Sequence, residues 1–554
     1  MLQDFLFGRD FPDFVPKVSG MRTRIFSTGI QDVVALLITC GLMLAGDLRA
    51  ELKLHSLFTD HAVLQSGMAV PVWGHANPDD SVEVSFAAQK VTTKAGADGR
   101  WMISLKSLAA SVEPRVMTVK AGEQSVTVKD VLVGEVWVCS GQSNMAMSVS
   151  GSLGKEKTVE ESKKGDYGTI RLFKAPVRGE DERQSEVDAL WAICDKKSVV
   201  RFSATGFYFG RALNRDLKVP VGLIQSASGG TNAYSWINSG TYQKNPAAQI
   251  SREFFDQAVK IYPQAKQRYD EQLKAWREKV KEAKGTGTPA KGRAPRAPMG
   301  LKHVKRPTGH YNAMIAPLQP YAIKGAIWYQ GEANSRPPFA PNYEALMLAM
   351  VEGWRQDWAA QLPGKAEKRD FPFYLVQLPN FAGGHAQGWP LIREQMLQFW
   401  KNGKDTGMVV AIDVGEAKDI HPRDKTPVGE RLARFARGNA YGEDLVYSGP
   451  VYQSMAVKGS SIEVKFAHAG EGLKSSDGQA LRHFSVAGAD GVFVEAEAKI
   501  TAKDTLTIGS DKVKEPQAVR YAWTSNPEKV NFFNAEELPA SPFRTDKWDA
   551  MEAE

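Results

Sequence analysis

Short runs of alternating hydrophobic and polar residues dominate the region from residue 51 to residue 128. Clusters of Asn, Asp, Pro and Gly separate these runs and are typical of turns. Alternation with a period of two places every second side chain on one face, so the runs predict β-strands with one buried face. Their regular spacing predicts a β-sandwich-like domain over residues 51–128. The clearest strands are expected at 69–74, 81–86 and 115–119.

From residue 129 the pattern changes to fully hydrophobic runs that alternate with helix-like segments. A strand that is hydrophobic at every position is buried on both faces, which is typical of a parallel sheet covered by helices. The predicted fold class is therefore α/β, with a parallel sheet flanked by helices over residues 129–442. Strands are expected at 131–138, 220–225, 323–329, 373–378 and 408–412, and helices at 203–217, 343–358 and 426–441.

Beyond residue 442 alternating runs return, at 462–466 and 491–496. They predict a C-terminal β-rich domain over residues 443–545. The chain is thus expected to have an α/β centre with additional all-β regions at both ends. This division fits its length, because 554 residues exceed what one compact hydrophobic core usually holds.

The first fifty residues differ from all three regions. A basic start at 21–24 is followed by an apolar stretch at 33–45 and then by a small residue, Ala50. This order is typical of a secretory signal peptide, so residues 1–50 are predicted to be an upstream segment plus a cleaved leader. The apolar stretch is too short to span a membrane. The mature protein is expected to be exported, to the periplasm or the extracellular space, without a stable membrane span.

Composition and charge narrow the function classes. With 43% hydrophobic and 24% charged residues, the chain is not disordered as a whole. Much of its net charge of +7 lies in a basic run at about 279–306, which is predicted to be a flexible, solvated loop. Loose binding of this run to an acidic polymer is the alternative. Elsewhere the charges are close to balanced, so no nucleic-acid partner is expected.

The cysteines and histidines do not form a pattern typical of a metal site. Cys139 and Cys194 remain after removal of the leader, and neither belongs to a CxxC pair. The nine histidines show no metal-ligand spacing, so neither a metal nor a cofactor is expected. The two thiols either form one disulfide or remain free and buried, and the sequence leaves both arrangements open.

Four polar segments follow predicted strands, and in an open α/β sheet ligands bind beyond the carboxyl ends of the strands. Ser143 lies in the first segment, where a Gly-rich turn leads into a predicted helix whose free amides favour developing negative charge. Ser and Asn are also common helix caps. Gly229 and Gly230 lie in the second segment, where they either let backbone amides approach a substrate or form a plain tight turn.

Asn334 ends the third segment, and its amide either donates to an oxyanion or satisfies its own turn. His421 lies in the fourth segment, after the last predicted strand of the sheet. A single histidine is more often structural than catalytic. The position of His421 at the mouth of the sheet, with Asp419 two residues before it, favours a role as general base.

These four segments resemble the sequence blocks of the SGNH hydrolases, and more closely those of the sialate O-acetylesterase family. The motifs are GQSNM at 141–145, SGGT at 228–231, WYQGEAN at 328–334 and DIHP at 419–422. Each motif alone is weak, but together they follow the order of that family over nearly the whole mature chain. Further similar stretches are PVWGHA at 71–76, VLVGEVWVCSGQSNM at 131–145, YNAMIAPL at 311–318 and LPASPFRTDKW at 538–548.

The resemblance implies an SGNH-like fold and a serine esterase that removes O-acetyl groups from sugars. Ser143 is then the nucleophile and His421 the base that takes its proton. The resemblance further implies an oxyanion hole made of the Ser143 amide, the amide of Gly230 or of Gly229, and the Asn334 side chain.

The acid that orients His421 departs from the pattern of the wider superfamily. There the acid lies three residues before the histidine, and that position is Lys418 here. Asp419 is the first candidate and Asp413, eight residues before the histidine, is the second. A backbone carbonyl that orients the ring is the third.

The expected partner is an acetylated sugar or polysaccharide, because the motifs recognise the acetyl ester and not the sugar. An esterase that acts on acetylxylan or another polysaccharide is therefore the alternative to a sialate O-acetylesterase. An inactive carbohydrate-binding protein on an esterase scaffold is the alternative from another class. The oligomeric state is open.

Overall fold

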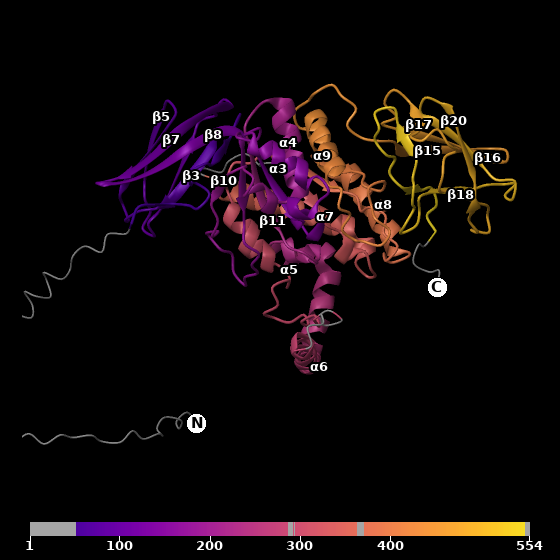
Figure 1. Ribbon diagram of the computed structural model, residues 1–554, viewed down its shortest axis with the longest axis horizontal. Helices are drawn as coiled ribbons and strands as arrows, with labels where there is room; N and C mark the ends of the chain where they lie inside the picture. Colours follow the sequence, from indigo (N-terminus) through magenta and orange to yellow (C-terminus); the bar gives the residue numbers. More distant parts are fainter. Residues whose placement is uncertain (1–50, 286–291, 293, 363–369, 549–554) are drawn as a thin grey trace, which may run out of the picture. The chain divides into compact units, whose positions relative to one another are not determined.

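A large mixed sheet lies at the centre of the structure, and seven of its strands follow the order β10-β9-β11-β8-β12-β13-β14 (Figure 1). Neighbours along this path are parallel, except that β10 is antiparallel to β9. The computed structural model describes residues 51–285, 292, 294–362 and 370–548, so the leader predicted at 1–50 lies outside the described residues. The strands are β8 (Gln124–Gly141), β9 (Ile170–Lys174), β10 (Trp191–Ile193), β11 (Val221–Ala227), β12 (Gly325–Tyr329), β13 (Phe373–Val376) and β14 (Thr406–Val409).

The predicted α/β class is confirmed, because helices and parallel strands alternate along the central region. Strands β11 to β14 are buried at every position, as their continuous apolar runs predict. Helices α4 and α9 pack against each other and against the sheet, and α7 packs against α8. The helices are α2 (Ser143–Ala146), α3 (Lys155–Lys163), α4 (Ala204–Leu217), α5 (Ser239–Lys244), α6 (Gln249–Gly285), α7 (Tyr343–Ala360), α8 (Gly388–Asn402) and α9 (Thr426–Asn439).

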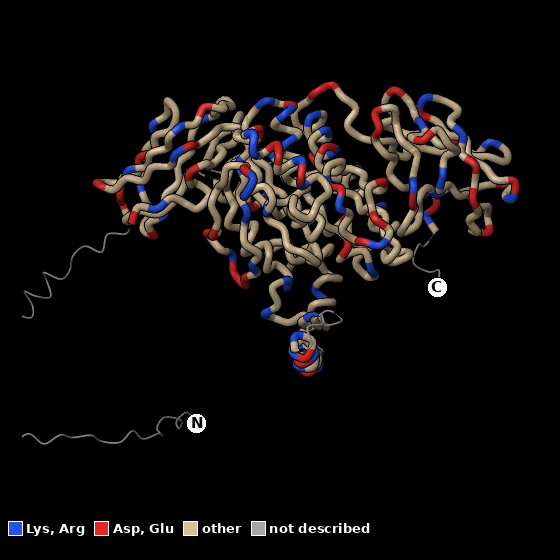
Figure 2. Tube along the Cα trace, viewed as in Figure 1, with Lys and Arg blue, Asp and Glu red and all other residues tan. Residues whose placement is uncertain are grey.

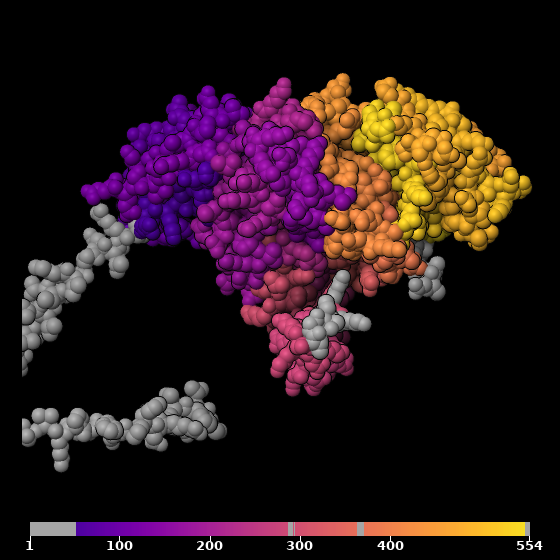
Figure 3. Space-filling view, viewed as in Figure 1, coloured from indigo at the N-terminus to yellow at the C-terminus, as the bar shows by residue number. Residues whose placement is uncertain are grey.

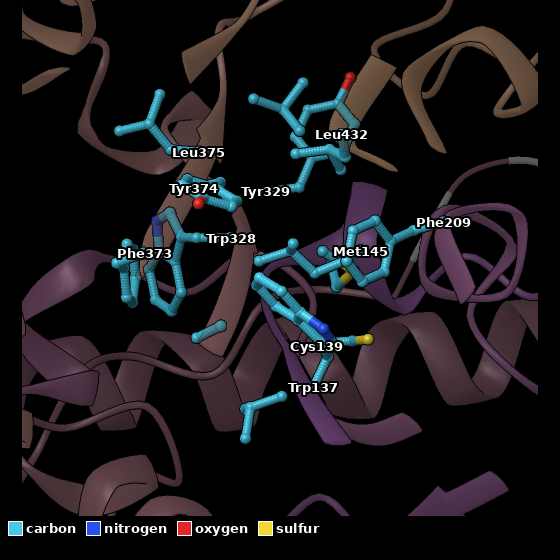
Figure 4. Packing of buried hydrophobic residues seen from close by; sticks show 14 of the residues in the cluster. Trp137, Cys139, Met145, Phe209, Trp328, Tyr329, Phe373, Tyr374, Leu375 and Leu432 are labelled. Carbon is cyan, nitrogen blue, oxygen red and sulfur yellow. The ribbon is translucent and has the colours of Figure 1, made fainter. Parts of the chain in front are cut away.

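Large aromatic side chains fill the space beside the central strands (Figure 4). Trp137 of β8 meets Phe209 of α4 edge to face at 5.1 Å between ring centroids, and meets Tyr374 of β13 at 5.7 Å. Trp328 of β12 meets Phe373 of β13 at 6.0 Å. Such rigid aromatic pairs fix neighbouring strands relative to one another, so the strand ends that carry the polar segments are also held in place.

Strand β8 connects the N-terminal strands to the central sheet. Its first half pairs with antiparallel β7 and is partly exposed, whereas its residues from Val131 onward are continuously buried, and those from Glu135 onward pair with β11 and β12. The boundary predicted at 128/129 therefore falls inside one strand. The sheet is mixed, not purely parallel as predicted, because no Gly or Pro interrupts residues 124–133 and the strand continues through them.

The N-terminal strands form two antiparallel groups. One is a sheet with the order β1-β3-β6, and the other joins β5, β4 and β7 to β8. Strand β2 pairs with β8 in parallel. The strands predicted in this region are confirmed as β3, β4 and β7. The bounds are β1 (Lys53–Leu54), β2 (Val63–Gln65), β3 (Val70–His75), β4 (Ser81–Phe86), β5 (Gln89–Lys94), β6 (Arg100–Leu105) and β7 (Ser111–Ala121).

The C-terminal region consists of short strands in three sheets, and the space-filling view shows it beside the orange α8–α9 region (Figure 3). The strand predicted at 462–466 is confirmed within β16. The prediction of a strand at 491–496 is wrong in extent, since Gly491 turns the chain with a φ of 70° and only Val494–Glu495 pair. The strands are β15 (Val451–Lys458), β16 (Ser461–Ala467), β17 (Leu473–Ser475), β18 (Phe484–Ala487), β19 (Val494–Glu495), β20 (Glu497–Ala502), β21 (Thr505–Gly509), β22 (Ala518–Tyr521), β23 (Phe532–Asn534) and β24 (Phe543–Arg544).

The basic run predicted to be a flexible loop is partly ordered. Helix α6 extends away from the sheet and includes residues 279–285, because Glu, Lys and Ala favour a helix in this stretch (Figure 1). At the other end of the run, Arg306 is buried and donates to Asp181 at 2.7 Å. Residues 286–291 and 293 lie outside the described residues.

Charged residues of both signs are interspersed along α6 and over the rest of the described chain (Figure 2). Among the described helices, none combines the length and the apolar character that crossing a lipid bilayer requires.

Candidate active site

Segments that follow three central strands meet at the carboxyl edge of the sheet. Ser143 begins α2 directly after β8, Gly229 follows β11, and Asn334 follows β12. Hydrogen bonds tie these segments to one another, from the Ser228 amide to the Gly141 carbonyl at 3.0 Å and from the Gln142 amide to the Tyr329 carbonyl at 2.9 Å. Parallel strands end at the same edge, which explains why residues far apart in the sequence converge here.

Gly141 allows the sharp turn that presents Ser143. Its φ of 132° is unfavourable for residues with a side chain, and a Cβ at this position would lie 2.3 Å from the Tyr329 carbonyl oxygen. The chain therefore leaves β8, passes close to the end of β12 and begins α2 at the serine.

The side chains of Ser143 and His421, which the sequence analysis assigned as nucleophile and base, lie next to each other. The Nε2 atom of His421 lies 2.8 Å from the Ser143 Oγ, which is hydrogen-bonding distance. Burial lowers the pKa of His421 below its usual value; the charge of Asp419 opposes this shift and the charge of Lys425 adds to it. A neutral imidazole with a free lone pair on Nε2 can accept the serine proton, so the pair can perform nucleophilic chemistry.

The other side of the His421 ring faces Asp419 without a hydrogen bond to it. The Asp419 Oδ1 accepts the backbone amide of His421 at 2.9 Å and lies 3.6 Å from the ring Nδ1. This carboxylate thus fixes the backbone at His421 and contributes its charge to the ring. Among the described residues, no backbone carbonyl accepts a hydrogen bond from Nδ1. Asp413 instead forms a two-point ion pair with Arg431, at 2.7 and 2.6 Å.

Of the two glycines after β11, Gly229 lies against the serine. A Cβ added at Gly229 would lie 3.6 Å from the Ser143 Cβ, whereas one at Gly230 would meet the Lys305 Nζ at 3.0 Å. Gly230 has a φ of 65°, and its carbonyl accepts a hydrogen bond from the Lys305 Nζ at 3.3 Å. The glycine pair therefore forms a turn whose first residue faces the serine and whose second residue faces a lysine.

The Asn334 carboxamide is fully buried and held on both sides. Its Oδ1 accepts the Ala233 amide at 3.0 Å and the Gln330 Nε2 at 2.8 Å, and its Nδ2 donates to the Asn232 Oδ1 at 3.1 Å. An amide group has two N–H donors, so one of them remains for a ligand. This network fixes the orientation of the amide plane in advance of binding.

Sequence reasoning missed a buried polar cluster beside the Ser143–His421 pair. Asn144, Glu332 and Lys425 form this cluster, and Asn144 hydrogen-bonds both of the others. Asn144 and Glu332 stood inside recognised motifs, but nothing in those motifs indicated contact between them. Lys425 carried no signal, because its position at the start of α9 is typical of a solvated lysine and only the fold buries it.

The cysteines lie apart from this chemistry. Cys139 in β8 and Cys194 are both free and buried, so the second of the two open alternatives holds. Burial raises the pKa of both thiols, which makes them poor nucleophiles. Among the described residues, no group of His, Cys, Asp and Glu has the arrangement of a metal site.

Comparison with known proteins assigns the chain to a family. The family described as carbohydrate esterase, sialic acid-specific acetylesterase matches residues 133–284 and 298–437. A sialate O-acetylesterase from Rattus norvegicus is 29% identical over 510 residues, covering 85% of this chain and 90% of the rat protein. The corresponding protein of Homo sapiens is 28% identical over 527 residues, covering 88% and 91%.

A solved structure supports the same assignment. The crystal structure of a carbohydrate acetylesterase from Xanthomonas citri covers 90% of this chain and 100% of that chain, with 33% sequence identity and a TM-score of 0.74. The protein therefore belongs to the sialic acid-specific acetylesterase family of carbohydrate esterases, and it is a carboxylic-ester hydrolase.

Proposed function

We propose that the protein hydrolyses O-acetyl esters of sugars through an acyl-enzyme on Ser143. The observation that carries the proposal is the 2.8 Å hydrogen bond between the His421 Nε2 and the Ser143 Oγ at the carboxyl edge of the sheet. Membership in the carbohydrate esterase family supports a sugar acetate as the substrate. The sheet order and the four motif segments around its edge support an SGNH-hydrolase-like arrangement of the proposed catalytic domain, residues 129–442.

In this mechanism His421 transfers one proton in each of two half-reactions. It takes the Ser143 proton as the Oγ attacks the acetyl carbonyl, and it gives that proton to the sugar oxygen as the C–O bond breaks. Water then attacks the acetyl-serine while His421 accepts one of its two protons, and that proton passes to the Ser143 Oγ as the bond between the Oγ and the acetyl carbon breaks. Acetic acid leaves and ionises to acetate. Neutral His421 is required at the start of both halves, and burial of the ring favours that state.

Negative charge on the carbonyl oxygen would be stabilised by three donors. They are the Ser143 amide at the start of α2, a backbone amide of the glycine turn, and the free N–H of Asn334. The contact between Gly229 and Ser143 supports the Gly229 amide over the Gly230 amide as the turn's donor.

Asp419 would act on His421 mainly through its charge. Its 3.6 Å separation from Nδ1 supports electrostatic stabilisation of the imidazolium, and its hydrogen bond to the His421 amide fixes the loop. The ion pair of Asp413 with Arg431 supports a structural role for that acid.

Export by the leader at residues 1–50 remains part of the proposal, with residues 51–128 and 443–545 as the two all-β domains beside the catalytic one. Acetylated sugars outside the cytoplasm, in the periplasm or the extracellular space, would then be the substrates.

Acetate release from a panel of acetylated sugars tests the proposed function. The panel contains O-acetylated sialic acids, acetylxylan and an aryl acetate, and the wild-type protein is compared with Ser143→Ala. We expect loss of many orders of magnitude in rate on every substrate, with unchanged thermal stability. Ser150→Ala, an exposed serine in the same region, is the matched control and should keep full activity.

Each outcome of that panel decides one part of the proposal. More than a few per cent of aryl-acetate hydrolysis by Ser143→Ala would contradict the nucleophile assignment. A preference for acetylxylan would replace sialate by a polysaccharide as the substrate. Sugar binding without acetate release from any substrate would identify a binding protein on an esterase scaffold.

A further inference from the structure

Beside the proposed catalytic pair lies the buried cluster of Asn144, Glu332 and Lys425, which the mechanism above leaves without a task. Asn144 and Lys425 are fully buried. The Asn144 Nδ2 donates to the Glu332 Oε1 at 2.5 Å and to the Ile420 carbonyl at 3.0 Å, and its Oδ1 accepts from the Lys425 Nζ. One carboxamide thus uses both N–H donors and its oxygen inside the protein.

The two ends of this network are next to the reacting groups in sequence. Asn144 follows Ser143, and Ile420 precedes His421. A hydrogen bond from Asn144 to the Ile420 carbonyl therefore connects the start of α2 to the loop that carries the base. Lys425, directly before α9, connects the far end of the same loop to the same amide. The loop is held at both of its ends by one side chain.

We propose that Asn144, Glu332 and Lys425 are positioning residues that fix the His421 loop against Ser143, with Asn144 as their common hydrogen-bonding partner. The inference rests on the proposed function, because it gives these residues a task only if Ser143 and His421 react. None of the three needs to touch the substrate.

The two ionisable groups of the cluster, Lys425 and Glu332, act on each other. Lys425 faces Glu332 after β12, Asp419, Glu416 and Asp424 in the base loop, and the ring face of Tyr329 at 5.2 Å. Burial lowers the pKa of Lys425 to about 7, and these carboxylates oppose the shift. Burial raises the pKa of Glu332, whose Oε2 has no hydrogen-bond partner among the described residues. Burial thus favours the neutral form of each group, while the charge of each favours the ionised form of the other.

His421 is the group on which this charge balance acts. Protonated Lys425 disfavours a second positive charge, so it lowers the pKa of His421, while Asp419 raises it. The base must be neutral to accept the Ser143 proton, so a lower pKa extends activity to lower pH. Removing the lysine should therefore raise the pKa of His421 and move the acidic limb of the activity profile to higher pH.

The test compares Lys425→Met with Lys418→Met, which removes an exposed lysine from the same loop. The pH dependence of kcat/KM on an aryl acetate is measured for both variants. We expect the acidic limb of Lys425→Met to move upward by about half a pH unit or more, with a roughly tenfold fall in kcat. Lys418→Met should keep the wild-type profile. A fall in kcat with an unmoved limb would reduce Lys425 to a structural residue and overturn the charge argument.

Two further measurements keep the inference decidable if Lys425→Met folds poorly. Glu332→Gln keeps the shape of the side chain and removes a carboxylate charge that favours protonated Lys425. Since protonated Lys425 lowers the pKa of His421, the acidic limb should move to higher pH, as for Lys425→Met; an unmoved limb would count against the proposal. In the wild-type protein, the NMR titration of His421, assigned with His421→Asn, should give a pKa below 6.5, and a higher value would overturn it. Failure of the proposed function is distinguishable from failure of this inference, because the former would appear as activity in Ser143→Ala.

Discussion

Two buried cations of this protein, Lys425 and Arg393, occupy opposite kinds of environment. Arg393, in α8, is fully buried and its guanidinium donates four hydrogen bonds to backbone carbonyls, at 2.7 to 3.1 Å. Lys425 lies among carboxylates beside the Ser143–His421 pair. Backbone carbonyls accept hydrogen bonds but do not titrate, so the surroundings of Arg393 keep the same charge at every pH. The protonation of Lys425, in contrast, depends on the charges of its neighbours.

The acceptors of Arg393 show what these surroundings do. Two come from the segment after β13, Leu378 and Pro379, and two from the C-terminal region, Thr524 and Ser525. Burial lowers the pKa of Arg393, but the planar fork of donors matches these fixed oxygens. This cation therefore joins two regions of the chain. The comparison teaches that the neighbours of a buried charge distinguish its roles. Titratable side chains around it indicate a functional site, whereas backbone carbonyls around it indicate a structural role.

The largest expected effect is that of Arg393→Met on the stability of the fold. The substitution keeps much of the apolar volume but leaves several buried carbonyls without a donor, at about 1–3 kcal/mol each. We expect the free energy of unfolding to fall by about 3 kcal/mol or more, measured by urea denaturation. The fraction that remains folded should keep its kcat.

Arg336→Met, at an exposed position, is the control for Arg393→Met and should leave the urea midpoint unchanged. A stable Arg393→Met protein with low kcat would contradict this comparison, because it would show that Arg393 contributes to catalysis and not to stability.

Asn334→Ala tests the other region in this comparison, the proposed active site beside Lys425. If the free N–H of Asn334 donates only to the developing oxyanion, kcat should fall by about a hundredfold while KM changes little. Steady-state kinetics on an aryl acetate separates the two parameters, and thermal denaturation reports the cost of the lost contacts to Ala233, Gln330 and Asn232. A rise in KM alone would make Asn334 a substrate-binding residue.

The sequence predicted the parts of the site that depend on strand position. Hydrophobic runs located β8, β11, β12, β13 and β14, and parallel strands must end at one edge, so the serine and histidine segments were expected to meet. Side-chain partners across that edge depend on the packing of α2 and α9, which no local pattern encodes. The contacts of Asn144 with Glu332 and Lys425, and the ion pair of Asp413, therefore became visible only in the structure.

Boundaries were harder to predict than elements for a related reason. Strand β8 pairs with the N-terminal strands and with the central ones, and it changes from partial exposure to complete burial without a turn, so the sequence offered no break at the predicted boundary. Likewise, residues 279–285 contain the same Lys and Glu that make a loop soluble, and those residues also extend α6. Composition separates buried from exposed segments better than it separates a solvated helix from a solvated loop.

The smallest expected effect distinguishes Asp419, which acts on His421, from Asp413, which has a structural role. Asp419 raises the pKa of His421, so Asp419→Asn should move the acidic limb of kcat/KM to lower pH, opposite to the shift expected for Lys425→Met. Since its carboxylate lies 3.6 Å from Nδ1 and makes no hydrogen bond to the ring, kcat should fall by no more than about tenfold. Asp413→Asn breaks the pair with Arg431 and should lower stability while leaving the limb in place. A loss far above tenfold in Asp419→Asn would mean that the carboxylate rotates onto Nδ1 during the reaction, and the site would then work as a full triad.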